Sequence, residues 1–295
     1  MVRWLVTGAS GFIGRRIVKL LDEARVEVHS VARRPGSLPG GETMHYADML
    51  DRDAVTHLID ELRPTHLMAL AWCTEHGKFW TDPANDTWRR ATLALAEHFL
   101  DRGGRAVVGA GSCAEYRWDG STCREGVTPL EPATPYGRAK AELSAALGDA
   151  CARRGARYAW GRIFFAYGTG EPQGKLFPSL VNSALANRPL SLREPRRVLD
   201  FIHADDVASA FATLALGEMH GACNVATGRP ITVERLAATI VAVTGSSSSV
   251  RVDEAAAPAP DVTADVAKLE SAGWRPRVDI VDGIRETAEG LRVEP

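Results

Sequence analysis

Apolar and polar positions follow two alternating patterns along this chain. Short apolar runs, typical of buried strands, are followed by stretches with the 3.6-residue period of amphipathic helices. The expected strands cover residues 2–6, 26–32, 43–46, 65–70 and 105–109, and the expected helices cover 13–24, 51–61, 86–102 and a stretch beginning at Tyr136. Regular alternation of strands and helices favours a parallel sheet with helices on both faces. The pattern therefore predicts an α/β fold with a Rossmann-type, doubly wound parallel sheet.

The second half of the chain is patterned less regularly. It predicts helices over residues 207–216 and 233–243, with Asp205 or Asp206 as the N-cap of the first. The stretches 246–249 and 255–260, rich in serine or in alanine and proline, are interpreted as flexible connections. These two stretches are therefore not expected to mark a domain boundary.

The first strand leads directly into a glycine-rich turn. Residues 7–14 read TGASGFIG. In a strand, turn and helix unit the first glycine permits a tight turn, the second lets a pyrophosphate approach the backbone, and the third lets helix and strand pack closely. The helix N-terminus adds unpaired N–H donors for the anion. The expected dinucleotide contacts in this turn are Gly8, Ser10, Gly11, Phe12, Ile13 and Gly14.

The end of the second strand bears on the choice of cofactor. An acidic residue there would bind the adenosine ribose 2′-OH of NAD, but the sequence continues from Ala32 to Arg33 and Arg34. Arginine suits a 2′-phosphate, so NADP(H) is favoured and NAD(H) is possible. The alternative is that the two arginines form a solvated turn. Further expected cofactor contacts are Asp48, a candidate partner of the adenine amino group, and Met49, Leu70, Ala71 and Trp72.

Composition excludes several classes of partner. The 295 residues, 45% of them hydrophobic, suffice for one large domain or for a large and a small one. A net charge of -2 provides no basic field for nucleic acid or an anionic membrane, so a small-molecule substrate is expected. The five cysteines are scattered and show no metal-binding spacing, which favours reduced thiols and no metal site. The sequence shows neither a signal peptide nor a membrane span, so a cytoplasmic location is expected.

The most specific chemistry lies between residues 112 and 140. Tyr136 and Lys140 are four positions apart on one face of the expected helix. An ammonium there should lower the pKa of the phenol and let Tyr136 exchange a proton with an alcohol or ketone. Ser112, after the fifth strand, can hydrogen-bond the same oxygen. The candidate catalytic residues are therefore Ser112, Tyr136 and Lys140, and the tyrosine and lysine are also expected to contact the cofactor.

With these motifs the chain resembles the extended short-chain dehydrogenase/reductase family, in particular its NAD(P)-dependent epimerase/dehydratase group, which acts mostly on nucleotide sugars. The resemblance covers nearly the whole chain and rests on TGASGFIG, GSCAEY, YGRAK, RIFFAYGTG, DFIHADDVA, CNVATGRPIT and AGWRP. It implies that Ser112, Tyr136 and Lys140 are the catalytic triad. It also implies a homodimer, a dinucleotide-binding domain over 1–165 to which 200–222 returns, and a smaller substrate-binding domain over 166–199 and 223–295.

Departures from the family pattern narrow the expected reaction. In the family's dehydratases and decarboxylases the two residues after the catalytic serine or threonine supply carboxylates, whereas this chain has Cys113 and Ala114. Elimination is therefore not expected. Glu115 comes one position too late, where the family usually has an aliphatic residue that points away from the substrate. The remaining chemistry is ketone reduction, or epimerisation through a transient ketone.

Together with the two arginines, these departures favour an oxidoreductase. The expected reaction is reduction of a keto group, most simply at C4 of a nucleotide-linked deoxysugar, with hydride from NADPH and a proton from Tyr136. A nucleotide-sugar 4-epimerase with tightly bound NAD is the alternative. A dinucleotide-binding sensor without catalysis is the second alternative, because fold alone does not fix function.

Substrate contacts are harder to assign from the sequence. The family's diphosphate-binding arginines are replaced by Leu199 and about Ala255, so nearby arginines substitute for them or the substrate lacks a diphosphate. The aromatic segment after the fourth strand either forms a substrate wall or packs on the next helix. Glu75 and His76 of that segment are candidate catalysts, and an exposed polar loop is the alternative explanation for them. The expected substrate-binding residues are Glu75, Cys113, Ala114, Phe164, Lys175, Phe177, Arg196 and Arg197.

Overall fold

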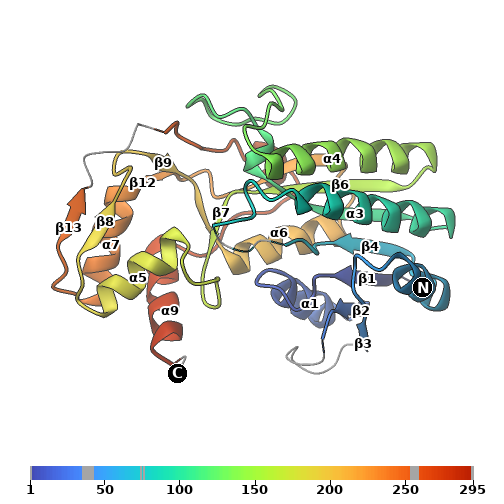
Figure 1. Ribbon diagram of the computed structural model, residues 1–295, viewed down its shortest axis with the longest axis horizontal. Helices are drawn as coiled ribbons and strands as arrows, with labels where there is room; N and C mark the ends of the chain where they lie inside the picture. The colour runs from blue at the N-terminus through green and yellow to red at the C-terminus, as the bar shows by residue number, and fades with distance from the viewer. Residues whose placement is uncertain (1, 35–42, 74, 76, 253–258, 294–295) are drawn as a thin grey trace. The chain divides into compact units, whose positions relative to one another are not determined.

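The computed structural model describes residues 2–34, 43–73, 75, 77–252 and 259–293 (Figure 1). The chain forms two compact units. Unit 1 contains Met1–Arg117, Pro129–Ile163 and Ala208–Cys223, and unit 2 contains Trp118–Thr128, Phe164–Val207 and Asn224–Pro295. The segment Trp118–Thr128, inside the expected cofactor domain, thus belongs to unit 2.

Unit 1 is built on a seven-stranded sheet in the order β11-β6-β5-β4-β1-β2-β3. Its strands are β1 (Arg3–Thr7), β2 (Glu27–Ala32), β3 (Thr43–Tyr46), β4 (His66–Ala69), β5 (Ala106–Ser112), β6 (Arg157–Ile163) and β11 (Gly221–Val225). The pairs formed among β1 to β6 are all parallel. The predicted Rossmann-type sheet is confirmed, and β11 extends it beyond β6.

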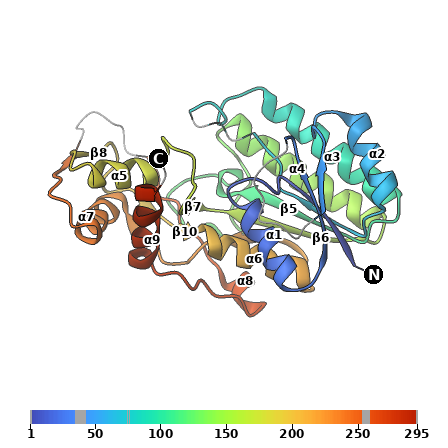
Figure 2. The same ribbon diagram turned by 90° about the horizontal axis from the view of Figure 1, so that it is seen from below.

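Helices cover both faces of this sheet. They are α1 (Gly14–Glu23), α2 (Arg52–Leu62), α3 (Ala84–Asp101) and α4 (Pro135–Arg153), together with the second part of α6 (Ala204–Leu216). Helices α3 and α4 lie side by side over one face, whereas α1 and α6 lie on the other (Figures 1 and 2). The core under α3 and α4 includes Phe99, Leu143 and Leu147 packed with Val107 of β5. The helices expected over 86–102 and from Tyr136 are therefore present and packed on the sheet.

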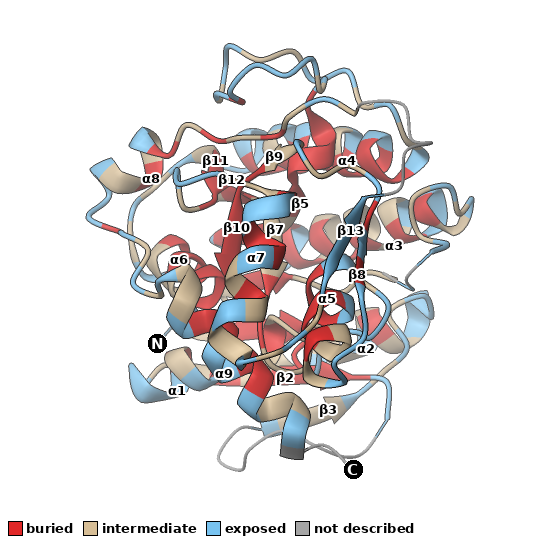
Figure 3. Ribbon diagram, turned by 90° about the vertical axis from the view of Figure 1, so that its left-hand side faces the viewer, coloured by how far each residue is buried: buried red, intermediate tan, exposed pale blue. Residues whose placement is uncertain are grey.

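The described residues of unit 2 form three short strand pairs and four helices. Strand β7 (Phe165–Tyr167) pairs with β10 (Phe201–His203), β9 (Val198–Leu199) with β12 (Ile231–Thr232), and β8 (Leu190–Leu192) with β13 (Val250–Val252). The helices are α5 (Leu176–Leu185), α7 (Val233–Thr244), α8 (Ala267–Ser271) and α9 (Ile280–Val293). Helices α5, α7 and α9 pack on one another. Each of them has both buried and exposed residues (Figure 3).

The predicted N-cap before residue 207 is wrong. Asp205 and Asp206 both lie in the first turn of α6, which begins three residues earlier than expected. Instead of capping a helix, the buried Asp206 carboxylate accepts hydrogen bonds from the backbone N–H groups of Arg277, at 2.9 Å, and Val278, at 3.0 Å. It thus fixes the segment that precedes α9.

The predicted connection 255–260 falls largely on residues 253–258, which lie outside the described ranges. Within those ranges, no helix has the length and apolar character needed to span a bilayer.

Candidate active site

The glycine turn between β1 and α1 is shaped by contacts that leave no room for side chains. Gly8 has a φ of 71°, and a Cβ on it would lie 2.8 Å from the backbone N of Ala71. A Cβ on Gly14 would lie only 2.1 Å from the carbonyl oxygen of Gly8. The Gly11 N–H donates to that same carbonyl at 3.0 Å. Such a close turn at the start of an uncapped helix is the form that binds a dinucleotide pyrophosphate.

Other predicted cofactor contacts lie around this turn. Thr7 Oγ1 accepts hydrogen bonds from the N–H groups of Leu70, at 3.2 Å, and Ala71, at 3.3 Å, so the end of β4 adjoins the turn. Ser10 and Gly11 are exposed, whereas Phe12 and Ile13 are half-buried. The remaining positions are also on the surface or close to it: Arg33 and Arg34 are exposed at the end of β2, Asp48 is exposed and accepts from the Leu50 N–H, and Met49 is half-buried.

The structure brings Ser112, Tyr136 and Lys140 together. A Cβ on Gly137 would lie 2.1 Å from the carbonyl oxygen of Ala114, so the start of α4 is pressed against the segment that follows Ser112. This approach places the Ser112 side chain close enough to the Tyr136 phenol to lower its pKa, against the effect of burial. Lys140, one turn further along α4, is buried and its ammonium donates to the carbonyl of Ala110 in β5 at 2.8 Å.

Aromatic rings enclose the tyrosine. The rings of Phe79 and Trp80 meet the Tyr136 ring edge-on, with centroids 4.9 and 5.6 Å away, and Trp72 does so at 6.4 Å. The Trp72 ring also lies 3.8 Å from the Lys140 ammonium, a cation–π contact. The aromatic segment after β4 therefore packs around the candidate catalytic residues. Sequence reasoning missed this role for Phe79 and Trp80, although the high aromatic content of the segment was its signal.

Burial dominates the acid–base behaviour of this pair. It raises the pKa of Tyr136, an effect that the hydrogen bond with Ser112 only partly offsets. It lowers the pKa of Lys140 to about 7, although the nearby Glu115 carboxylate acts in the opposite direction. The predicted lowering of the tyrosine pKa by the ammonium is therefore wrong, because the cost of desolvating a phenolate dominates and the opposing contribution comes from Ser112.

The residues after Ser112 have no carboxylate available for the substrate. Cys113 and Ala114 are buried in the short helix η1 (Cys113–Glu115). Glu115 is fully buried, and its carboxylate accepts hydrogen bonds from the Ser112 N–H at 2.8 Å, Trp160 Nε1 at 2.9 Å and Arg162 Nε at 2.7 Å. These contacts occupy both oxygens. Sequence analysis did not find the side-chain partners of Glu115, because they lie more than forty positions away.

The predicted substrate residues of unit 2 have contacts of their own. Phe164 and Phe177 are buried, and the Phe177 ring stacks on Tyr167 with centroids 4.1 Å apart. Lys175 precedes α5, and its ammonium lies 3.7 Å from Glu171. Burial raises the pKa of that glutamate to about 7.

The remaining predicted contacts lie on or near the surface. Arg196 is exposed, whereas Arg197 pairs with Glu194 at 2.9 Å and lies over the ring of Trp118. In unit 1, Glu75 is exposed and pairs with Lys78. His76 lies outside the described residues. Glu75 and the unit 2 residues therefore remain predictions as substrate contacts.

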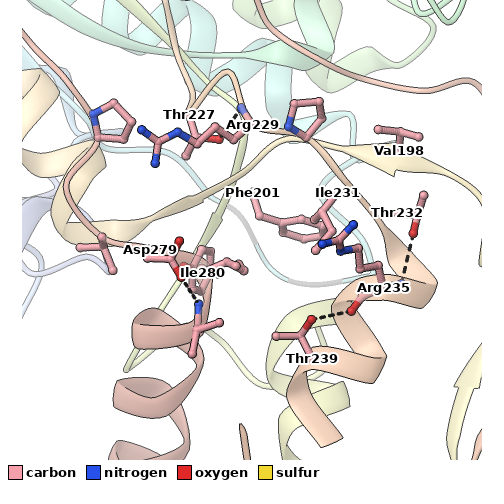
Figure 4. A pocket seen from close by; sticks show the side chains of 15 residues that line it. Val198, Phe201, Thr227, Arg229, Ile231, Thr232, Arg235, Thr239, Asp279 and Ile280 are labelled. Carbon is pink, nitrogen blue, oxygen red and sulfur yellow. Dashed lines mark hydrogen bonds between the residues drawn. The ribbon is translucent and has the colours of Figure 1, made fainter. Parts of the chain in front are cut away.

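Unit 2 also contains a cavity of ≈ 720 Å³ beside the first turns of α7 and α9 (Figure 4). Phe201 and Ile231 contribute apolar surface, and Arg229 and Arg235 contribute guanidinium groups. The five substrate residues predicted in unit 2 are not among those that line it. The cavity therefore does not support those predictions.

His203, Asp205 and Glu286 are the described residues that could hold a metal ion, with one ligand atom from each lying within 4.8 Å of the others. The backbone N–H of Asp205 donates to Nδ1 of the buried His203 at 3.3 Å. In the neutral ring this bond leaves the proton on Nε2, which faces the Glu286 carboxylate at 3.5 Å. Among the described residues Nε2 makes no hydrogen bond, so the cluster is a buried histidine close to two exposed carboxylates.

Comparison with known proteins agrees with this geometry. A family model described as "NAD dependent epimerase/dehydratase family" matches residues 4–226, about three-quarters of the chain. The chain belongs to this family. Its sequence is 25% identical to a UDP-glucose 4-epimerase of Azospirillum brasilense, over 97% of this chain and 90% of the relative.

Two solved structures of similar proteins match the whole fold. The UDP-glucose 4-epimerase of Thermus thermophilus, in complex with NAD, is 27% identical, with a TM-score of 0.87 and 99% of each chain covered. MoeE5 in complex with UDP-glucose and NAD is 26% identical, with a TM-score of 0.85 and 98% of each chain covered. These similar structures contain NAD, which leaves the expected preference for NADP without support from the comparisons.

Proposed function

We propose that this protein is a nucleotide-sugar 4-epimerase that uses bound NAD, and that it inverts a carbinol carbon through a transient ketone. The observation that carries the proposal is the convergence of Ser112, Tyr136 and Lys140, with alanine at 114 and the Glu115 carboxylate fully occupied. These side chains can move one proton at one hydroxyl oxygen of a substrate. Epimerisation through a ketone needs no other acid or base, since the cofactor would take and return the hydrogen on carbon. The names of the similar proteins support the same reaction.

The glycine turn fits the dinucleotide. Gly8, Gly11 and Gly14 would hold its pyrophosphate against the start of α1. A Cβ on Gly8 or Gly14 would collide with backbone, so this close turn requires glycine at both positions. When bound, NAD supplies reversible removal and return of hydrogen at the carbinol carbon. Lys140 would hold the cofactor ribose beside the end of β5.

Tyr136 exchanges the proton of the sugar hydroxyl. It accepts the proton as the ketone forms and returns it after the ketone has presented its other face. Ser112, whose side chain lies next to Tyr136, donates to the same oxygen and fixes its position. The ring of Trp72 faces the Lys140 ammonium and stabilises the charged form of that lysine.

A second candidate is the NADPH-dependent reduction of a 4-keto sugar. The observation that favours it is the exposed pair Arg33 and Arg34 at the end of β2, where an acidic residue would bind NAD. Reduction uses the same three side chains in one direction only. The two candidates differ in whether cofactor is consumed.

Incubating the protein with UDP-glucose and NAD, and separating the products by chromatography, tests the proposal. We expect conversion to the 4-epimer without accumulation of NADH. A parallel reaction with NADPH and a nucleoside-diphosphate 4-keto-6-deoxyhexose should leave NADPH unchanged. Oxidation of NADPH, with no interconversion of UDP-glucose, would instead establish the reductase.

Replacing the phenol tests the role of Tyr136. Tyr136→Phe should lower turnover by ~10²–10⁴-fold and preserve NAD affinity, since it removes the proton carrier but not the turn that holds the cofactor. Tyr158→Phe is a matched control, because this buried hydroxyl bonds Ser144 and lies outside the proposed reaction. A sensor without catalysis would show no turnover in the unmodified protein.

A further inference from the structure

Glu115 and Arg162 form a buried ion pair next to Ser112. Their side chains are 0% and 5% exposed, and Glu115 Oε2 lies 2.7 Å from Arg162 Nε. Arg162 also donates to the Tyr116 hydroxyl at 3.0 Å. Burying two charges is costly unless both are well hydrogen-bonded, and here both are.

The other oxygen of Glu115 holds the catalytic segment. Glu115 Oε1 accepts the Ser112 N–H at 2.8 Å and the Trp160 Nε1–H at 2.9 Å. The Ser112 hydroxyl oxygen in turn accepts from the Ala114 N–H at 3.2 Å, which completes a capping box at η1. Both the backbone and the side chain of Ser112 are therefore fixed by this short segment.

The surrounding chain leaves room for this carboxylate. A Cβ on Gly111 would lie 2.4 Å from Glu115 Oε1 and 2.2 Å from Trp160 Nε1. An aliphatic residue at position 115 would leave the Ser112 N–H, the indole N–H and a buried guanidinium without their acceptor, each at a substantial cost. The hydrogen-bond donors around position 115 thus require a carboxylate there.

We propose that Glu115 is a positioning residue whose carboxylate, held by Arg162 and Trp160, keeps the Ser112 hydroxyl in place against Tyr136. The proposal rests on the proposed function in so far as Ser112 and Tyr136 act on substrate. Glu115 itself touches neither substrate nor cofactor in this scheme.

The negative charge of Glu115 also affects the pKa values of Tyr136 and Lys140. Burial dominates the pKa of both Tyr136 and Lys140, and the carboxylate adds a rise to each. Removing its charge while Arg162 stays positive should therefore lower both pKa values. This shift reports the charge of Glu115 at the two side chains, whereas a fall in kcat reports its positioning of Ser112.

Glu115→Gln is the direct test, with kcat, KM and the pH dependence of kcat measured for sugar interconversion. We expect kcat to fall ~10–100-fold with KM within about twofold, and the pH profile to move ~0.5–1 unit toward acid. Glu115→Gln/Arg162→Met removes both charges and should move the profile back toward that of the unmodified protein. Glu131→Gln, in an exposed ion pair with Arg117, is the matched control and should change none of the three measured quantities.

A readout without substrate separates this inference from the proposed function. Titration of Lys140 by NMR in isotopically labelled protein should show a pKa lower in Glu115→Gln than the value of about 7 expected for the unmodified protein. If the unmodified protein converts no sugar, the proposed function fails, and this titration still decides the electrostatic part of the inference. An unchanged pKa for Lys140 would overturn that part.

Loss of stability alone would count against positioning. If Glu115→Gln lowers the melting temperature but keeps kcat and the pH profile, the residue is structural and the inference is wrong. If that variant does not fold, Arg162→Lys replaces it, because lysine preserves the charge balance but removes the Nε donor that orients Glu115. A reduced kcat at unchanged KM would then support the inference, and an unchanged kcat would overturn it.

Discussion

Gly14→Ala is the sharpest test of the cofactor turn. The added methyl group would lie 2.1 Å from the Gly8 carbonyl oxygen and 2.9 Å from its carbonyl carbon. Both atoms belong to backbone, so no side chain can rotate away to relieve the contact. Either α1 must move from β1 by about 1 Å or the turn must open, since van der Waals contact between carbon and oxygen needs ~3.2 Å or more.

The size of the effect follows from two opposing contributions. Forcing an extra methyl group into a packed site costs ~1–3 kcal/mol. Replacing glycine by alanine in a helix returns only ~0.5–1 kcal/mol. We therefore expect a net loss of ~1–2 kcal/mol in the free energy of unfolding, or several degrees in melting temperature, and at least ~10-fold weaker NAD binding if the turn opens.

Thermal unfolding and calorimetric titration with NAD measure both effects. Gly148→Ala is a matched control in α4, where the new Cβ would meet the Tyr158 ring at 3.4 Å, an ordinary contact. This second alanine should stabilise the protein slightly and leave NAD binding unchanged. If Gly14→Ala retained the melting temperature and NAD affinity of the unmodified protein, the steric explanation of the turn would be refuted.

Two further predictions concern charged groups. Burial raises the pKa of Glu171 from 4.5 to about 7. The carboxyl group is neutral below pH 4.5 in both the folded and the unfolded protein, and the folded protein loses stability as pH rises through about 7, because the buried group must then ionise. Glu171→Gln should therefore raise the free energy of unfolding by ~1–3 kcal/mol at pH 8, with little gain near pH 4.5, in urea titrations at both values; a gain independent of pH would contradict this. Trp72→Leu removes the ring that faces the Lys140 ammonium and should lower the pKa of Lys140 below about 7. Turnover at pH 7 should fall ~2–30-fold, with Trp72→Phe intermediate in initial-rate assays, whereas equal rates in all three proteins would exclude a cation–π role.

Features governed by local spacing were predictable from the sequence. The turn containing Gly8 and Gly14 depends on a strand, a turn and a helix that follow one another directly. Tyr136 and Lys140 share a helix face because they are four positions apart. In both cases the residues that define the feature lie within about fifteen positions of one another, so the pattern alone determines their arrangement.

Features governed by strand register were not predictable. Glu115 meets Arg162 because β5 pairs with β6 so that Gly111 lies opposite Arg162, a register that the sequence pattern does not specify. The pKa of Tyr136 was predicted with the wrong sign because it depends on how deeply surrounding rings bury the phenol. The N-cap near Asp206 failed for a similar reason, since its carboxylate binds a segment some seventy residues away.

The order in which the chain supplies the strands of the sheet affects how unit 1 can fold during synthesis. Strand β11 and the second part of α6 belong to the fold of unit 1 but are encoded after a long segment of unit 2. A fragment ending at residue 163 would lack both, and β6 would offer open hydrogen-bonding groups to other molecules. During synthesis, unit 1 is thus incomplete until residue 223 has left the ribosome, so its folding depends on that of the unit 2 segment encoded before residue 208.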